Sequence, residues 1–78
     1  MEDGQILKHI KDVAEEEKRL YAQRHLNNPE DLRRLHKMNV ELDQCWDLLR
    51  QRRALRDAAA DPDVAAVRPE SVVENFKP

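Results

Sequence analysis

Apolar residues recur along residues 3–26 at the spacing of a helix. The main series has intervals of four, three and seven residues and consists of Ile6, Ile10, Val13 and Leu20. Glu17 stands where a further apolar residue would complete that series. A second series recurs every seven residues, at Leu7, Ala14 and Tyr21. Spacing near 3.5 residues is typical of a helix that packs against another helix, so we predict a helix over 3–26.

A longer helix is predicted over residues 29–60. Its apolar series alternates steps of three and four residues, at Leu35, Met38, Leu42, Cys45 and Leu49. Asn28 is a favourable N-cap, and Pro29 suits the first helical position. Asp61-Pro62 is expected to end the helix, because the residue before a proline is disfavoured in the α region.

The two helices are expected to form an antiparallel hairpin, because only residues 27–28 separate them. Across such a turn, facing residue numbers sum to a constant near 55. This rule pairs Leu20 with Leu35, Val13 with Leu42, Ile10 with Cys45 and Ile6 with Leu49. It also pairs opposite charges, Arg24 with Asp31 and Asp3 with Arg52, the latter expected to be exposed. Glu17 faces Met38 and is expected to bend outward.

The predicted fold class is all-α: a coiled-coil-like hairpin over residues 1–60, followed by a tail over 61–78 with short helical turns. Asp61-Pro62 and Arg68-Pro69 are the helix-start signals of this tail. Its apolar residues are candidates to cover Leu48 and Leu55 on one flank of the hairpin. These candidates are Val72, Val73 and Phe76.

The opposite flank carries a second apolar stripe, which we call the interaction face. It consists of Leu7, Ala14, Tyr21, Leu32, Asn39 and Trp46. A lone hairpin would leave this face in water, and contiguous exposed apolar area marks an interaction surface. We expect a homodimeric four-helix bundle in which Asn39 pairs with its copy. In the competing arrangement, the tail folds over this face and the protein stays monomeric.

Composition supports a helical protein and argues against several other classes. The 78 residues include 38% charged residues, one glycine and three aromatic residues, unlike a β-sandwich or barrel. No apolar run is long enough to span a membrane, and the acidic opening does not resemble a signal peptide. The single cysteine cannot form an internal disulfide. We therefore expect a cytoplasmic protein with no membrane partner.

Four arginines near the end of the second helix form an arginine cluster, consisting of Arg50, Arg52, Arg53 and Arg56. Guanidinium groups bind phosphate, so the cluster is a candidate contact for nucleic acid or an acidic partner. The alternative is a solvated face with salt bridges inside the hairpin. The net charge is −2 and no aromatic residue is interleaved for base stacking, so nucleic-acid binding is not favoured.

Cofactor and metal chemistry is not expected. His9, His25 and His36 do not share one helix face at ligand spacing, and no Glu-x-x-His motif occurs. Cys45 is expected to pack in the hairpin interface as a small hydrophobe. We expect Trp46 to pack in a bundle core or a dimer interface.

The segment Leu42–Arg56, LDQCWDLLRQRRALR, resembles the hallmark of a family of short, uncharacterised actinobacterial proteins. Residues Gln5–Glu17 and Arg68–Glu74 resemble the same family. This resemblance implies a helical fold in a bacterial cytoplasm and carries over no catalytic or ligand residue. Asp43–Leu55 is also loosely similar to the first helix of all-helical chorismate mutases, whose buried cationic cluster has no evident counterpart in this chain.

The sequence therefore predicts no enzyme. The favoured function is a non-enzymatic, small helical interaction or adaptor protein, whose partners are a second copy and an unknown protein. The alternative is a nucleic-acid-associated regulator that uses the arginine cluster. A chorismate-mutase-like enzyme is the remote alternative.

Overall fold

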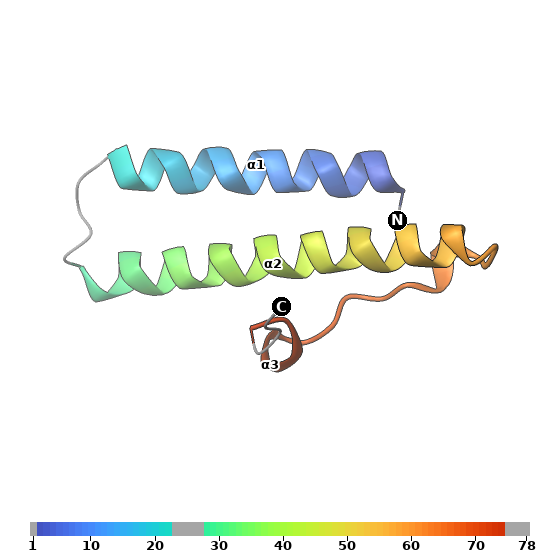
Figure 1. Ribbon diagram of the computed structural model, residues 1–78. Coiled ribbons are helices and arrows are strands. Elements are labelled where there is room, and N and C mark those ends of the chain that lie inside the picture. The colour runs from blue at the N-terminus through green and yellow to red at the C-terminus, as the bar shows by residue number, and fades with distance from the viewer. Residues whose placement is uncertain (1, 23–27, 75–78) are drawn as a thin grey trace.

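The computed structural model describes residues 2–22 and 28–74, which are mostly helical and contain no strand. Two long antiparallel helices lie side by side, and the tail runs back along the second helix (Figure 1). The prediction of an all-α hairpin is confirmed. The elements in chain order are α1 (Asp3–Ala22), α2 (Pro29–Asp57), η1 (Pro62–Val64) and α3 (Glu70–Val73).

The start of α2 follows the predicted capping. The Asn28 side chain accepts a hydrogen bond from the backbone N–H of Glu30 at 2.9 Å, and Pro29 takes the first helical position. This bond satisfies one of the backbone donors that a helix leaves unpaired at its start. Residues 23–27, including Arg24 and most of the expected turn, lie outside the described residues.

The end of α2 differs from the prediction. The helix ends at Asp57 rather than residue 60, because the backbone closes there with hydrogen bonds typical of a Schellman motif. The N–H of Ala60 donates to the Leu55 carbonyl at 2.8 Å, and the N–H of Ala59 donates to the Arg56 carbonyl at 3.0 Å. Ala59 has a φ of 56°, in the left-handed region usually occupied by glycine.

The core between α1 and α2 is built from the predicted apolar series. One cluster contains Val13, Leu20, Leu35 and Met38, and the other contains Ile6, Ile10 and Leu48. Leu42 packs against both clusters and joins them. Leu48, which we expected on a flank awaiting cover, belongs to the core. None of the described helices is long and apolar enough to cross a membrane.

Glu17 departs from the expectation that it bends outward. Its Oε2 is buried and has no hydrogen-bond partner among the described residues. Position 17 continues the apolar series of α1, so the carboxylate is drawn into the helix interface with the rest of that series. An unpaired buried oxygen lowers stability because it gives up water without replacing it.

The tail wraps the side of α2 that faces away from α1 (Figure 1). Ala65 packs against the cluster around Leu48, while Val72 remains exposed. The expected cover by Val72 is therefore wrong. Val73 is half-buried and lies beside Trp46, and Phe76 lies outside the described residues. The chain reverses directly after α2, so the first residues of the tail reach Leu48 and the later ones pass beyond it.

Candidate functional site

The interaction face is exposed. The exposed fractions of its large side chains are 49% for Leu7, 49% for Tyr21, 50% for Leu32 and 46% for Trp46. Ala14 and Asn39 are exposed as well. Leu7 from α1 and Trp46 from α2 line one shared hollow, as antiparallel pairing predicts. The described part of the tail leaves most of this face exposed.

The end of the tail reaches only the edge of the interaction face. Val73 and Glu74 line a shallow hollow together with Trp46 and Asp43. The carboxyl groups of Glu74 and Asp43 share a hydrogen bond, which raises the pKa of Glu74. Trp46 keeps nearly half of its surface exposed beside them.

The hollow shared by Leu7 and Trp46 lies at the open end of the hairpin, where the interaction face meets the arginine cluster. We call it the basic hollow, and its volume is about 190 Å³. Its apolar floor consists of Leu7, Trp46 and Leu49. Its polar rim consists of Asp3, Arg50, Arg53 and Arg56. The structure thus joins two candidate sites that the sequence analysis had treated separately.

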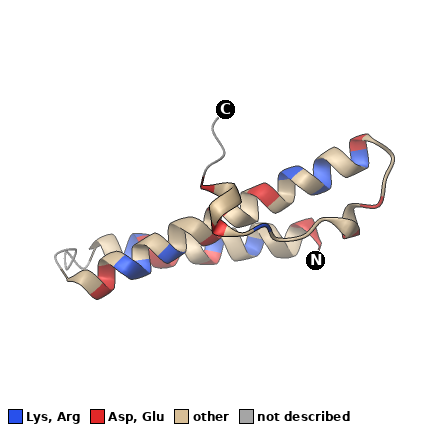
Figure 2. Ribbon diagram, turned by 90° about the horizontal axis from the view of Figure 1, so that it is seen from below, with Lys and Arg blue, Asp and Glu red and all other residues tan. Residues whose placement is uncertain are grey.

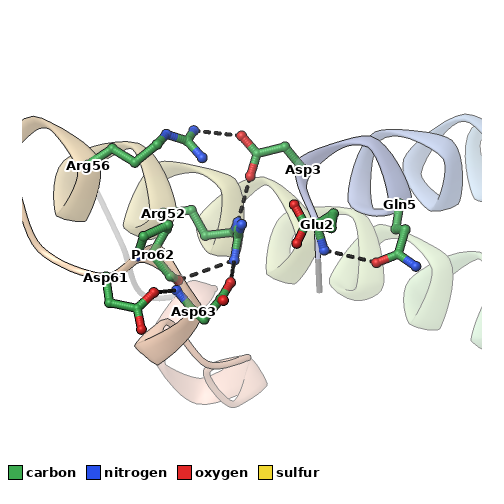
Figure 3. Close-up of polar contacts among 8 residues, drawn as sticks. All are labelled: Glu2, Asp3, Gln5, Arg52, Arg56, Asp61, Pro62 and Asp63. Carbon is green, nitrogen blue, oxygen red and sulfur yellow. Dashed lines mark hydrogen bonds and ion pairs between the residues drawn. The ribbon is translucent and has the colours of Figure 1, made fainter.

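Arg52 is separated from the other arginines by burial, with only 4% of its surface exposed. Its Nε donates to Asp3 Oδ1 at 2.5 Å, and its Nη1 donates to Asp63 Oδ1 at 3.0 Å and to the Pro62 carbonyl at 3.2 Å (Figure 3). The predicted Asp3–Arg52 pair is present, but the expectation that it is exposed is wrong, because η1 folds over it. Arg52 ties the start of α1 to α2 and the tail.

Arg56 shares Asp3 with Arg52. Its Nη2 donates to Asp3 Oδ2 at 2.6 Å (Figure 3). The hydrogen bonds from Arg56 and then Arg52 lower the pKa of Asp3 to about 2. Asp3 is therefore a carboxylate at neutral pH and neutralises part of the cluster.

Arg50, Arg53 and Arg56 are exposed, whereas Arg52 is buried. Among the described residues, Arg53 takes part in no ion pair. Lys and Arg residues are interspersed with Asp and Glu residues along both long helices (Figure 2). The exposed cations of the cluster lie along one edge of α2, where Arg56 pairs with Asp3 and Arg50 has an interaction of its own.

Asp47 is a buried charge that the sequence analysis missed. Arg68 donates to both of its carboxylate oxygens, through Nε to Oδ2 at 2.8 Å and through Nη2 to Oδ1. Gln51 adds a bond to Oδ2 at 2.8 Å. These bonds, above all those from Arg68, lower the pKa of Asp47. The available signal was a stripe on α2 at steps of four, three and four: Val40, Gln44, Asp47 and Gln51.

That stripe is where the tail is attached. Gln44 Nε2 donates to the Arg68 carbonyl at 3.1 Å, and Gln51 Nε2 donates to the Ala66 carbonyl at 2.9 Å. His36 Nε2 lies 2.9 Å from Glu70 Oε1 on α3. The tail is therefore held mainly through polar contacts, which apolar patterning does not predict.

The remaining histidine and cysteine side chains have structural surroundings. His9 Nε2 lies 2.5 Å from Glu41 Oε1 across the hairpin. Within residues 2–22 and 28–74, no group of three or more His, Cys, Asp or Glu side chains could hold a metal ion. His25 lies outside the described residues. Cys45 packs against the core, where burial raises the pKa of its thiol.

Comparison with known proteins places the chain among uncharacterised actinobacterial sequences. A family model described as "Protein of unknown function (DUF2630)" matches residues 2–78. The uncharacterized protein Rv0898c of Mycobacterium tuberculosis is 51% identical over 77 residues, covering 95% of this chain and 88% of the relative. An uncharacterized protein of Mycobacterium bovis, Mb0922c, is similar to the same extent. No solved structure matches.

Proposed function

The chain belongs to the DUF2630 family of proteins of unknown function, and from this premise we propose that it is a small, non-enzymatic interaction protein. The interaction face is its docking surface, and a second copy of the chain is its first occupant. Docking of two hairpins through this face gives a four-helix bundle of coiled-coil type. We place its action in the cytoplasm.

One observation carries the proposal: four large apolar side chains of the interaction face are about half exposed although residues 61–74 of the tail pack on the hairpin. Each is large enough to stabilise an interface by about 1 kcal/mol or more when its remaining exposed surface is buried. A small soluble chain that retains such a stripe gains stability by covering it.

The spacing of the interaction face favours a second copy as the occupant. Leu32, Asn39 and Trp46 are evenly spaced at seven residues on α2, as are Leu7, Ala14 and Tyr21 on α1. A two-fold axis through the middle of the face therefore packs each apolar end of the face against the opposite end of the face in the second copy. Asn39 lies near this axis, where paired amides fix the alignment of a dimer.

The single tryptophan makes this proposal directly measurable. Trp46 is the only tryptophan in the chain and lies on the interaction face. We expect its fluorescence to shift to shorter wavelength, and acrylamide quenching to fall, as protein concentration rises through the dimer's dissociation constant. Leu32→Glu should abolish this concentration dependence, because it buries a charge in the interface.

Arg53→Glu serves as the matched control, because it changes charge outside the interaction face and should retain the concentration dependence. A wild-type fluorescence spectrum that is the same from nanomolar to high micromolar concentration would exclude self-association through Trp46.

The alternative functions have less support in the geometry. A nucleic-acid regulator would use the whole arginine cluster, but Arg52 is buried in ion pairs and Arg56 shares Asp3 with it. A chorismate-mutase-like site needs a buried cation that is free to meet a dicarboxylate. The buried cation Arg52 instead donates to carboxylates of this chain.

A further inference from the structure

The basic hollow differs from the rest of the interaction face in its charge. Trp46 and Leu49 supply an apolar floor on α2, and Arg50, Arg53 and Arg56 continue the same side of the helix. These positions follow at steps of three, one, three and three, so they form one stripe about 15 Å long. An occupant must therefore match an apolar anchor and a row of cations together.

A second copy satisfies the charged half of this requirement only in part. Lys11 and Lys18 lie four residues after Leu7 and Ala14, beside the interaction face on α1. Neither lysine takes part in an ion pair among the described residues. Face-to-face pairing of two copies buries the apolar stripe but places both signs of charge around it, Lys11 and Lys18 on α1 and the carboxyl groups of Asp43 and Glu74 beside Trp46, so a second copy matches the row of cations only in part.

We propose that the basic hollow binds an acidic, amphipathic helix of a partner protein, whose apolar side chain enters between Leu7 and Trp46. Acidic residues beside that anchor pair with Arg53. This inference rests on the proposed interaction function and adds the chemistry of its partner. The partner helix and the second copy share Trp46, so they compete.

The shape of the site favours a helix over other anions. The hollow lies between two antiparallel helices, and a groove of this kind accepts a third helix along its axis. Guanidinium groups bind carboxylates through paired hydrogen bonds, and the floor of Leu7, Trp46 and Leu49 gives an apolar side chain of the same helix a surface to pack on.

Two synthetic helical peptides of about 20 residues test the proposal, a length that spans about 30 Å. Both carry the same leucine stripe, which is flanked by glutamates in one and by lysines in the other. We expect fluorescence anisotropy to show at least about tenfold tighter binding of the glutamate peptide to the full chain, weakening as salt rises. Equal affinity for the two peptides would overturn the proposal.

Arg53→Glu tests the site itself, because Arg53 is exposed and lies outside the core. It should weaken binding of the glutamate peptide about tenfold or more. Arg33→Glu is the matched control, since it makes the same charge change on α2 about 30 Å away. Equal loss in both variants would mean that overall charge, not the basic hollow, governs binding, and would overturn the proposal.

Two further readouts separate this inference from the proposed dimer. We expect the glutamate peptide to lower the mass measured by light scattering from that of a dimer to that of a one-to-one complex. If the protein is a dimer and does not bind the peptide, only the proposal of an acidic partner is wrong. If the protein is a monomer and binds the peptide, only the proposal of self-association is wrong. A DNA oligonucleotide that displaces the peptide and binds more tightly would assign the site to nucleic acid instead.

Discussion

Glu17 lies at the interface of the two long helices with a buried carboxylate oxygen that has no partner among the described residues. Replacing it with leucine should complete the apolar series of α1. We predict that Glu17→Leu raises the free energy of unfolding by about 1 kcal/mol or more, because a desolvated, unpaired oxygen is removed.

Urea denaturation followed by circular dichroism measures this change. The control is Glu15→Leu on the exposed side of α1, which should change the free energy of unfolding by no more than about 0.5 kcal/mol. A destabilised Glu17→Leu variant would show that the carboxylate has a partner that stabilises it.

Asp3 provides a second test at the scale of single residues, through the pH dependence of stability. Its pKa is about 2 in the folded chain against 3.8 ordinarily, so folding favours the carboxylate. The stability it contributes is fully present above about pH 4 and is lost as pH falls toward 2. We predict that Asp3→Asn is less stable than wild type at neutral pH and that the difference disappears near pH 2.

Thermal melts of the two proteins across this pH range measure the difference. Glu15→Gln, at an exposed position of α1 that forms no ion pair among the described residues, should track wild type throughout. A constant difference between Asp3→Asn and wild type down to pH 2 would contradict the assigned ion pairs.

At the scale of the elements, the apolar pattern determined the hairpin and its pairing. Val13 and Leu20 on α1, and Leu35 and Met38 on α2, form one of the two core clusters as expected. The cap of α2 could also be predicted, because Asn28 and Pro29 act on the first turn of the helix that directly follows them. The helices and their caps could be predicted because each depends on residues that lie close together in the sequence.

The tail could not be predicted in the same way. Its attachment depends on Arg68 reaching Asp47 and on glutamine side chains reaching backbone carbonyls, contacts between segments that share no periodicity. For the same reason, burial of Arg52 beneath η1 was missed although its partner Asp3 was identified. The basic hollow also emerged only when the two helices were placed together.

Two valines provide a matched test of the hairpin core. Val13 is 7% exposed between α1 and α2, whereas Val67 in the tail is 61% exposed. Val13→Ala should lower the free energy of unfolding by about 2 kcal/mol through the lost methyl groups. Val67→Ala should change it by less than about 0.5 kcal/mol. Equal effects in chemical denaturation would contradict the described packing.

The attachment of the tail to α2 through Arg68 and Asp47 can be tested separately from the hairpin. Arg68→Ala removes both hydrogen bonds to Asp47 and leaves a buried carboxylate with Gln51 alone. We predict faster amide hydrogen exchange within residues 61–74, with protection of α1 retained. Arg33→Ala, at an exposed position of α2, should leave exchange of the tail unchanged. Unaltered exchange in Arg68→Ala would show that the contact between Arg68 and Asp47 does not hold the tail in place.

At the scale of the whole molecule, the shape is the reason why we propose a partner. The molecule measures 47 × 25 × 18 Å, so it is long and thin, with one interface between its two long helices. Chains of this size bury a modest share of their surface and often gain stability through association. The interaction face is the exposed apolar surface that association would cover.

Light scattering after size exclusion tests this central claim most directly. We predict a dimer mass for wild type at high micromolar concentration, and a melting temperature that rises with concentration. Trp46→Glu should give a helical monomer, while Arg53→Glu should remain dimeric. A single-chain mass for wild type at high micromolar concentration, with a melting temperature independent of concentration, would contradict the account.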